Sequence, residues 1–406
     1  MQSIAQVSVI RVSDYEPDRV LDGLRNCLKP FGGLSKFVQP GNRVLIKPNI
    51  LGGFHPERAV TTHPSLIRAI IILVKELGGI PLIGDSPAIG TLEDALELSG
   101  IYEILEETGA QFIDFSEPYT YENSSNKLLK KITLSSALRS IDKVITVPKL
   151  KTHAQMAFTG ALKNQFGFVP GSLKSQWHFR LKDPDWLAAL ILDINRIVKP
   201  VLTIMDGIIA MDGPGPSSGN PKQLGLILAG DDPVAVDVIA CKIIDLNWRY
   251  VPLLRVAHEQ KFGATGLDKI QLHGGNLNDF IVHDFQNVNQ LVDVLRLAPL
   301  PTSVFNILRN TWVAKPRINE KLCSHCNRCK NTCPVTPPAI DPALAPHSQV
   351  DDFRCIRCYC CHEVCPEKAI YLKEHWLGAK LPLSTISDLG SRLISFLKNL
   401  KQHKVS

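Results

Sequence analysis

The sequence predicts an α/β domain, with a largely parallel sheet flanked by helices, followed by a small cysteine-rich domain. Short β-type runs alternate with helix-type runs through the first 300 of the 406 residues, as is typical of parallel sheets. Nine of the 11 cysteines lie between Cys323 and Cys365. The charge divides at the same point, because residues 301–406 hold 15 Lys and Arg against 8 Asp and Glu, whereas residues 1–300 hold 30 against 31. A chain of this length exceeds what one hydrophobic core usually serves, so at least two domains are expected.

The expected elements follow one another in the order that an α/β domain requires. Apolar and β-branched runs predict strands at residues 5–12, 43–46, 80–83, 112–115, 143–147, 201–205 and 224–228. Helical spacing of apolar residues predicts helices at residues 17–28, 64–77, 91–107 and 233–244. Gly78 and Gly79 end the second of these helices, and Thr91 caps the third.

Prolines and apolar spacing divide the chain into four parts. These are the α/β domain at residues 1–298, a linker at 299–318, the cysteine domain at 319–374 and an amphipathic tail helix at 375–406. Pro299, Pro301 and Pro316 mark the linker. Apolar residues three or four apart indicate the tail helix, namely Ile386, Leu389, Leu393, Phe396, Leu397 and Leu400. Most such helices dock on their own protein, and contact with a membrane surface or a partner is the minority interpretation.

Composition narrows the class of protein. Hydrophobic residues at 45% and charged residues at 21% are ordinary for a globular chain. The longest apolar run, residues 69–74, is far below the roughly 18 residues of a membrane span. The first residues have no basic start followed by an apolar stretch, so the expected compartment is the cytoplasm. The basic residues are scattered rather than grouped, so nucleic acid is not an expected partner.

Two cysteine motifs repeat within the cysteine domain. The first has its cysteines spaced by two, two and three residues before Cys333-Pro334, and the second has the same spacing before Cys365-Pro366. This is the pattern of two-cluster bacterial ferredoxins, in which the fourth cysteine of each motif binds the other cluster. The expected ligands of cluster 1 are Cys323, Cys326, Cys329 and Cys365, and those of cluster 2 are Cys355, Cys358, Cys361 and Cys333. Structural zinc needs only four ligands, so eight cysteines in two matching motifs do not favour a zinc site. Disulfides are unfavourable in a cytoplasmic chain, so we do not expect these cysteines to pair.

Three cysteines remain outside the predicted ligand sets. Cys360 is adjacent to Cys361, but only Cys361 keeps the spacing of the motif. We therefore interpret Cys360 as a packing residue beside the cluster. Cys27 and Cys241 lie in predicted helices and are expected to be buried and inert.

Residues 319–372 resemble bacterial-type two-cluster ferredoxins. The resemblance implies a small α+β ferredoxin-like domain with two [4Fe–4S] clusters and outer-sphere electron transfer. A proline-rich insertion at residues 335–338 departs from the compact pattern and leaves the predicted ligands intact.

Polar residues gather where predicted strands of the α/β domain end. In open parallel sheets, ligands bind beyond the carboxyl ends of the strands. The predicted substrate-binding residues at this edge are Lys47, Asn49, Lys149, Lys163, Asp206 and Asp212, and the predicted catalytic residues are His153, Lys151 and Asp85. The lysines suit an anionic substrate such as a carboxylate or phosphate. His153 is the expected general acid or base. The aspartates would serve as proton carriers or hold an additional divalent ion.

Each of these residues also has a structural interpretation. The lysines would then be solvated at the surface, Asp85 and Asp232 would be turn or helix caps, and His63 and His153 would be hydrogen-bonded structural residues. The coincidence of several polar residues at one predicted edge favours a site. The sequence has neither a P-loop nor a strand-linked GxGxxG motif, so it does not indicate nucleotide binding.

Several phrases of the α/β domain resemble an uncharacterised domain family that is often fused to a ferredoxin module. They are Lys47-Pro48-Asn49, Gly84-Asp85-Ser86, the stretch from Val147 to His153, the stretch from Phe158 to Asn164, and Asp212-Gly213-Pro214-Gly215-Pro216. The resemblance spans roughly residues 40–250. It implies an α/β domain joined to iron–sulfur clusters, and it supplies no reaction.

Two functions follow from these expectations. In the first, the clusters relay electrons to or from a small anionic substrate bound at the α/β domain, as in an iron–sulfur oxidoreductase. In the second, the chain is a non-enzymatic electron carrier, or a cluster or metal donor, whose α/β domain binds a redox partner protein. Clusters that serve only to stabilise the fold are the least favoured interpretation.

Overall fold

The computed structural model describes residues 4–88, 90–171, 174, 177, 183–288 and 314–373. The chain separates into two compact units, residues 1–288 and residues 289–406, called below the α/β unit and the cysteine unit. The predicted tail helix at residues 375–406 lies outside the described residues, as does most of the predicted linker.

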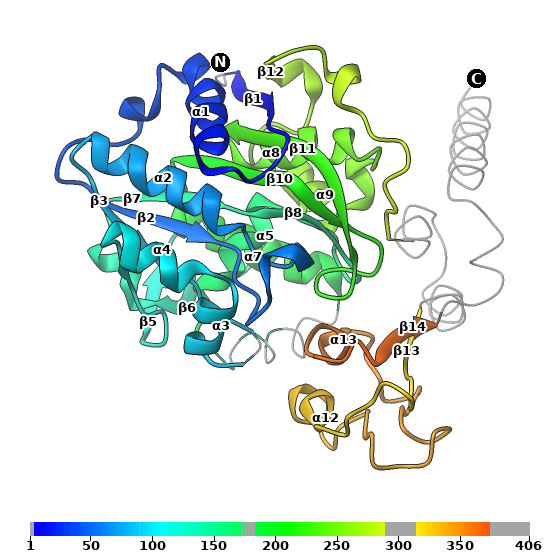
Figure 1. The fold of residues 1–406 in the computed structure, drawn as a ribbon. Helices are drawn as coiled ribbons and strands as arrows, with labels where there is room; N and C mark the ends of the chain where they lie inside the picture. Colours follow the sequence, from blue (N-terminus) through cyan, green and yellow to red (C-terminus); the bar gives the residue numbers. More distant parts are fainter. Residues whose placement is uncertain are drawn as a thin grey trace, which may run out of the picture. The chain divides into compact units, whose positions relative to one another are not determined.

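The described part of the α/β unit is built on a ten-stranded sheet (Figure 1). Its main path runs in the order β12 (Ile270–His273), β1 (Ala5–Arg11), β11 (Asn220–Gly230), β10 (Leu202–Asp212), β7 (Lys143–Val147), β2 (Arg43–Pro48), β3 (Ile80–Ile83) and β4 (Gln111–Phe112). Off this path, β8 (Lys149–His153) pairs with β10, and β9 (Ala157–Thr159) pairs with β8. Only the pairs of β11 with β1, β11 with β10 and β8 with β9 are antiparallel in this sheet. The prediction of a largely parallel sheet is confirmed.

Helices cover both faces of the sheet (Figure 1). One face is covered by α1 (Pro17–Leu28), α2 (Pro64–Glu76), α3 (Leu92–Leu98) and α4 (Ile101–Thr108). The other is covered by α5 (Ala161–Asn164), α7 (Pro184–Val198), α8 (Pro233–Ile243) and α9 (Pro252–Glu259). Strand residues alternate between the two cores, as Val44 and Ile46 lie in the first core and Leu45 in the second. Burial on both faces explains why these strands are almost continuously apolar.

Some predicted elements have different bounds. The helix predicted at residues 91–107 is two helices, α3 and α4, because Gly100 adopts a left-handed φ of 72° between them. The strand predicted at residues 112–115 is the short β4. The strands predicted at 201–205 and 224–228 are the longer β10 and β11, which pair along most of their length. A hairpin of β5 (Pro118–Glu122) and β6 (Lys131–Ser135) had not been predicted.

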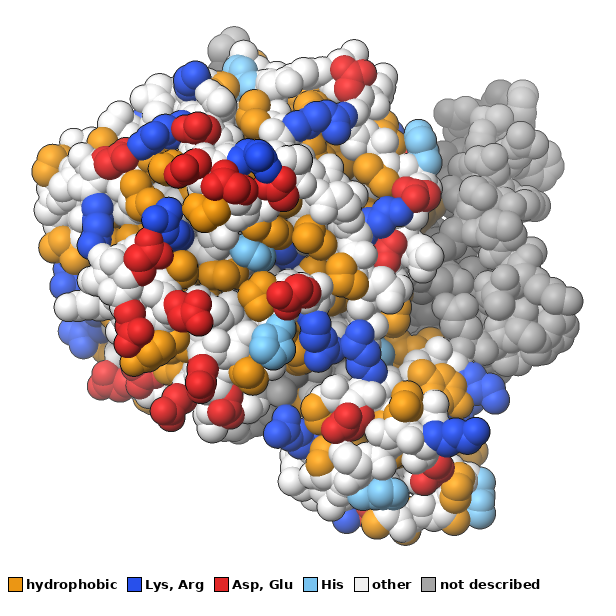
Figure 2. Space-filling view, in the orientation of Figure 1, with side chains coloured by type: hydrophobic (Ala, Val, Ile, Leu, Met, Phe, Trp, Pro, Cys, Tyr) orange, Lys and Arg blue, Asp and Glu red, His pale blue; other side chains and the backbone are white. Residues whose placement is uncertain are grey.

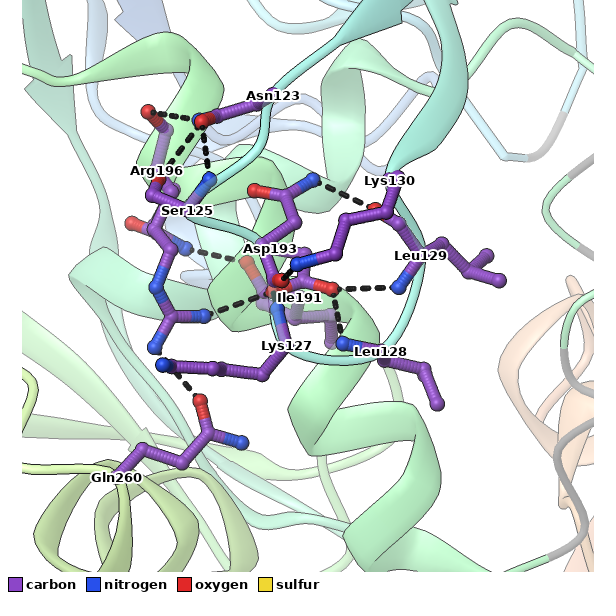
Figure 3. Close-up of polar contacts among 12 residues, drawn as sticks. Asn123, Ser125, Lys127, Leu128, Leu129, Lys130, Ile191, Asp193, Arg196 and Gln260 are labelled. Carbon is purple, nitrogen blue, oxygen red and sulfur yellow. Dashed lines mark hydrogen bonds and ion pairs between the residues drawn. The ribbon is translucent and has the colours of Figure 1, made fainter.

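The loop of this hairpin is fixed to α7 by Asp193 (Figure 3). Its fully buried carboxylate accepts the backbone N–H groups of Lys127, Leu128 and Leu129 at 2.7, 2.7 and 2.9 Å. The guanidinium of Arg196 adds an ion pair of 2.8 Å. Because every one of these donors compensates the lost hydration of the carboxylate, Asp193 acts as a structural anchor.

The described part of the cysteine unit closes on itself. β13 (Lys315–Ile318) pairs antiparallel with β14 (Ile370–Lys373), and the short helices α12 (Arg328–Thr332) and α13 (Cys360–Glu363) lie between them in the chain. β13 occupies residues that the sequence analysis placed at the end of the linker. The small core between these elements contains Cys329, Ile340, Cys361 and Ile370.

The surface of the α/β unit carries mixed charges. On the face shown in Figure 2, acidic and basic side chains are interspersed over the unit, with apolar side chains scattered among them. Among the helices of the described ranges, none has the length and apolar character needed to cross a bilayer.

Candidate functional site

The register of four neighbouring strands brings polar residues to one edge of the sheet. We call this the carboxyl edge, since the parallel strands β2, β3 and β7 end there. Lys47 in β2 is level with Thr146 in β7, and Lys149 in β8 is level with Asp206 in β10. Asp85 follows the end of β3 by two residues. Lys47, Lys149 and Asp206 therefore lie within strands rather than after them, which corrects their predicted position.

Lys47 and Asp85 form a buried ion pair. The Lys47 Nζ lies 2.8 Å from Asp85 Oδ1, and the two side chains are only 0% and 3% exposed. Burial lowers the pKa of the Lys47 ammonium, and the Asp85 carboxylate opposes this effect. The second oxygen of Asp85 accepts the Ile50 N–H at 2.8 Å. The solvated-surface interpretation of Lys47 is therefore wrong.

Two residues from the segment after β9 complete this pair. Asn164 accepts from Lys47 Nζ at 3.3 Å and donates to the Lys47 carbonyl at 3.0 Å and to Thr146 Oγ1 at 2.9 Å. Gly167 supplies the clearance, because a Cβ at this position would lie 2.2 Å from Asp85 Oδ1 and 2.6 Å from Lys47 Nζ. The pair thus depends on Gly167, because only a residue without a side chain allows the backbone to lie this close to the two charged groups.

A further lysine, Lys174, interacts electrostatically with Asp85. Lys174 donates a hydrogen bond to the Ser86 carbonyl. Burial lowers the pKa of Lys174 to about 7, and although Asp85 opposes this, Lys47 and Lys163 lower it further by repulsion. Lys174 is therefore acted on by one carboxylate and by two other ammonium groups, so positive charge gathers at this position. This arrangement suits an anionic ligand.

Asp237 orients the segment that carries Lys163 and Asn164. Its carboxylate accepts the N–H groups of Ala161 and Leu162 at 2.7 and 3.0 Å, at the start of α5. Burial raises the pKa of Asp237 to about 7, against the effect of these two hydrogen bonds. Asp237 is thus a positioning residue that lies behind the carboxyl edge.

A second buried ion pair joins Lys149 and Asp206. The Lys149 Nζ lies 2.9 Å from Asp206 Oδ2 and donates to the Tyr15 hydroxyl at 2.9 Å. The Tyr15 hydroxyl in turn donates to Asp206 Oδ1 at 2.7 Å, and the backbone N–H of His63 donates to Asp206 Oδ2 at 2.9 Å. Burial acts to raise the pKa of Asp206, but Lys149, His63 and Tyr15 outweigh it and hold the pKa below its usual value.

His63 is held against this pair as a neutral imidazole. Its ring stacks on the Tyr15 ring, with 3.5 Å between centroids and 6° between planes. The His63 Nδ1 accepts the Ser65 N–H at 3.2 Å at the start of α2, so the proton of the neutral ring is assigned to Nε2. Burial lowers the pKa of His63 to about 4; Asp206 opposes this shift, and Lys149 adds to it.

Lys151 and His153 continue along the same face of β8 as Lys149, because strand side chains alternate. Both are almost fully buried, at 1% and 0% exposed. The Lys151 Nζ donates to the Val60 carbonyl at 2.7 Å. The His153 Nδ1 accepts two backbone N–H groups, from Gln155 at 3.1 Å and from Met156 at 3.2 Å. Neither residue is a solvated surface group.

Several buried oxygens near Lys151 have no hydrogen-bond partner within the described residues. Thr159, directly opposite Lys151 in the β8–β9 pair, has such a hydroxyl. Thr61, which follows Val60, has another. Among the described residues, the side-chain carbonyls of Asn49 and Gln155 also have no partner. Since buried polar atoms are normally paired, Thr61 and Thr159 leave hydrogen-bonding capacity beside Lys151.

The predicted aspartates contact separate partners. Asp85 and Asp206 each pair with a lysine, whereas Asp212 Oδ2 accepts the Gln286 N–H at 3.2 Å. Around these aspartates, no three His, Cys, Asp or Glu side chains of the described residues form a group that could hold a metal ion. Asp232 caps α8 through the Val234 N–H at 2.8 Å, as its structural interpretation expected.

Four residues of this site were not among the predicted site residues: Tyr15, His63, Asn164 and Lys174. His63 precedes Pro64 at a helix start, which is a signal for a cap rather than for a site. Tyr15 lies far from β8 in sequence, and only the pairing of β10 with β8 brings Asp206 beside Lys149 to meet it. Lys174 follows no predicted strand, so no pattern in the sequence indicates it.

In the cysteine unit, eight cysteines line two cavities. The first cavity, about 330 Å³ of empty space, is lined by Cys323, Cys326, Cys329 and Cys365. The second, about 350 Å³, is lined by Cys333, Cys355, Cys358 and Cys361. These are the same two sets of four that the motif spacing assigned to clusters 1 and 2. Four cysteine sulfurs lining one cavity are a donor set that fits a [4Fe–4S] cluster. Cys360 is buried and lines neither of these cavities.

The backbone conformation of the two motifs also repeats. The residues on either side of the second cysteine of each motif are left-handed, with φ of 53° at His325 and 59° at Asn327 in the first motif. The equivalent values are 59° at Arg357 and 60° at Tyr359. The left-handed region is unfavourable for residues other than glycine. The shape of the loop around each cavity therefore imposes this backbone conformation on them.

Each Cys-Pro cysteine receives a backbone hydrogen bond. The Ala339 N–H donates to Cys333 Sγ at 3.3 Å, and the Ala369 N–H donates to Cys365 Sγ at 3.2 Å. Donors to the ligand sulfurs stabilise the negative charge of a thiolate-bound cluster. Each cavity therefore has at least one such bond, and further backbone donors reach Cys329 and Cys358.

Two family models match the chain. Residues 44–242 match a domain of unknown function, DUF362. Residues 315–366 match a 4Fe–4S dicluster domain, which is an iron–sulfur electron-transfer module.

Two solved structures are similar to parts of the chain. The lactate racemase apoprotein from Thermoanaerobacterium thermosaccharolyticum is 16% identical, with a TM-score of 0.33, over 57% of this chain and 54% of that one. A protein from Thermotoga maritima is 15% identical, with a TM-score of 0.31, over 50% of this chain and 53% of that one. The chain thus spans about half the length of each of these structures.

A curated relative is more similar in sequence. A thylakoid-associated protein of Synechocystis sp. is 37% identical over 264 residues, which are 64% of this chain and 81% of the relative. With the two domain matches, this similarity shows that the chain belongs to the family of proteins that join a DUF362 domain to a 4Fe–4S dicluster domain.

Proposed function

We propose that this protein transfers electrons through two [4Fe–4S] clusters to or from a small anionic substrate bound at the carboxyl edge of the α/β unit. Cys323, Cys326, Cys329 and Cys365 would hold one cluster, and Cys355, Cys358, Cys361 and Cys333 the other. The clusters would supply one-electron transfer. The two cavities, each lined by one of these sets, support the assignment.

The charge balance around Asp85 is the observation that supports an anionic substrate. Lys47 already neutralises this carboxylate in a buried pair. Lys174 is attracted by Asp85 and repelled by both Lys47 and Lys163. Two ammonium groups in a partly desolvated position attract a carboxylate or phosphate more strongly than they would in water.

The remaining predicted residues take separate roles in this proposal. Asp85 orients Lys47 and does not itself contact the substrate. Lys151 and Asn49 would hold polar groups of the ligand, beside the unpaired oxygens of Thr61 and Thr159. His153 would donate a hydrogen bond from its Nε2–H to the ligand, because its Nδ1 already accepts backbone N–H groups and the ring is then neutral.

A reoxidation screen tests the proposal. The full chain is reconstituted anaerobically, reduced with dithionite, freed of excess reductant and mixed with small carboxylates and phosphate esters one at a time. At least one compound should reoxidise the clusters, as followed by visible absorbance, and K163M and K174M should each slow that reaction. The exposed K131M is the matched control and should react like the wild type.

Two outcomes contradict the substrate proposal. One is that no compound reoxidises the clusters while a partner ferredoxin exchanges electrons with them rapidly, which favours the electron-carrier alternative. The other is that K131M slows the reaction as much as K163M and K174M do, which removes the lysines around Asp85 as the cause.

We propose the cytoplasm as the compartment, with the name of the Synechocystis relative pointing to association with thylakoids as the alternative. Deletion of residues 375–406 separates the two. Wild-type protein that stays in the supernatant after membrane sedimentation supports the cytoplasm. Wild-type protein that sediments with thylakoids, and is released by the deletion, supports association through the tail.

A further inference from the structure

The two halves of the cysteine unit give their cavities nearly the same backbone environment. The left-handed residues lie at equivalent positions in both motifs. One N–H···S hydrogen bond reaches each Cys-Pro cysteine, at 3.3 and 3.2 Å. Because these backbone features are similar at both cavities, a difference in cluster potential is expected from side-chain charge and from solvent exposure.

The side chains differ in charge and burial at the position before the second cysteine of each motif. In the first motif this position is His325, which is exposed. In the second it is Arg357, which is only 7% exposed. A buried guanidinium keeps its charge and acts through a lower effective dielectric than an exposed group does.

Arg357 belongs to a group of charges that is positive overall. Its Nη2 lies 3.4 Å from Asp352 Oδ1. The same carboxylate is bound by Arg317 at 2.7 Å and by Lys315 at 3.3 Å. Three cations thus share one carboxylate, and a second carboxylate, that of Glu363, acts on Cys358 at the same cavity. The Nε and Nη1 of Arg357 have no hydrogen-bond partner within the described ranges, so two buried donors remain for other acceptors.

The first cavity has a different charge environment. Arg328 and Glu367 both line it, and both are exposed. Their charges are opposite and screened by solvent, so they nearly cancel. Cys326 is also exposed there, whereas Cys358 at the equivalent position of the second motif is buried. This burial disfavours added negative charge and so opposes the effect of a nearby cation.

From this asymmetry we propose that the cavity lined by Cys333, Cys355, Cys358 and Cys361 holds the cluster of higher reduction potential, and that Arg357 is the main cause. Reduction adds one negative charge to a cluster, and a buried cation stabilises that charge. One electron from an external low-potential donor would therefore reside on the second cluster. An electron that enters at the first cluster moves to the second, which oxidises the first and reduces the second with no bond or proton transferred.

Potentiometric titration of the full reconstituted chain tests this proposal. Electron paramagnetic resonance spectra recorded against potential should show two separate reduction steps. R357M should lower the higher step toward the lower one and leave the lower step nearly unchanged. R357K retains the positive charge and should lie between R357M and the wild type. D352N removes the carboxylate shared by the three cations and should raise the higher step, an effect of opposite sign.

Iron and sulfide content, about eight of each per chain for two clusters, shows that each variant carries both. R328M is the matched control, since it removes an exposed arginine at the first cavity, and it should move the lower step by less than R357M moves the higher. The proposal fails if R357M moves only the lower step or neither step. It also fails if R357K and R357M have equal effects. Where R357M does not retain iron, an unchanged or lowered higher step in D352N contradicts the proposal by itself. None of these readouts depends on the anion site of the α/β unit.

Discussion

The Lys47 ammonium lies 2.8 Å from the Asp85 carboxylate in a position where neither side chain meets solvent. These residues come from neighbouring parallel strands, Lys47 from within β2 and Asp85 from just beyond β3. Asn164 and Gly167 close the position from the segment after β9. An ion pair in this setting is costly to break, because one partner would remain buried without a counterion.

Replacing Lys47 by methionine should destabilise the α/β unit by about 3–5 kcal/mol, as expected when one partner of a buried pair is removed. Urea denaturation followed by tryptophan fluorescence measures the change. The exposed pair of Lys131 and Glu122 is the control, with side chains 67% and 66% exposed, and K131M should cost less than about 1 kcal/mol. Similar losses in K47M and K131M would show that burial does not strengthen the first pair.

Replacing Gly167 by alanine should separate the same pair without removing a charge. The new Cβ would overlap Asp85 Oδ1 and Lys47 Nζ, at 2.2 and 2.6 Å. A loss of stability in the upper range for single substitutions, roughly 3 kcal/mol or more, is expected from this overlap. G266A is the control, because its Cβ would meet only the side chain of Asp268, which is exposed and free to move. Equal stability of G167A and the wild type would contradict the assigned role of Gly167.

His63 should remain neutral across the physiological range. Burial lowers its pKa to about 4, whereas a free histidine titrates near about 6.5. This group therefore contributes stability above pH 6.5, and that stability is lost as the pH falls through about 4. Nitrogen-15 NMR of the imidazole should show the Nε2–H tautomer with no titration between about pH 5 and 8. Y15L, which removes the stacked ring, should move the pKa upward, and a midpoint near neutrality in the wild type would contradict the assignment.

Asp237 should make the α/β unit less stable as the pH rises. Burial raises its pKa from 3.8 to about 7, so the protonated form is favoured in the folded state. The stability that this group contributes is complete below pH 3.8 and is lost as the pH rises through about 7. D237N should remove this part of the pH dependence in denaturation curves recorded from pH 4 to 8. The exposed Asp142 is the control, and an identical slope in D237N, D142N and the wild type would show that Asp237 does not titrate in this window.

Cys360 should be dispensable for cluster binding, whereas Cys361 should be essential. Cys361 lines the second cavity and Cys360 lines neither of the two. Iron analysis after reconstitution should give about eight iron atoms per chain for C360S and about four for C361S, the content of two clusters and of one. The reverse result would mean that the second motif uses the adjacent cysteine.

Much of the fold could be predicted from sequence, because the α/β unit buries both faces of its sheet. The apolar runs that predicted β2, β3 and β7 are the parts of those strands that reach both cores. The strand β8 was harder to predict from sequence, because its residues Lys149, Lys151 and His153 give no apolar pattern. The break between α3 and α4 depends on the conformation of Gly100, and a helical pattern on both sides conceals it.

The site was predictable in composition but not in arrangement. Reading the residues after each strand found Lys47, Asp85, Lys149 and Asp206, because parallel strands end at one edge. Which lysine pairs with which aspartate depends on register, and register is set by packing between distant segments. The stacking of Tyr15 on His63 joins two loops that no local pattern connects. Cysteine spacing, in contrast, predicted both sets of cavity-lining residues because the loop geometry is local.

The pairing of β13 with β14 has a consequence for how this protein was assembled. Chain entering the cysteine unit at Lys315 and chain leaving it at Lys373 lie opposite each other in the ladder. A segment whose two ends lie together can be inserted into, or removed from, another coding sequence without stretching its host. Residues 314–373 are therefore suited to transfer between genes as one unit. A single insertion of this electron-transfer domain can join it to a different electron acceptor.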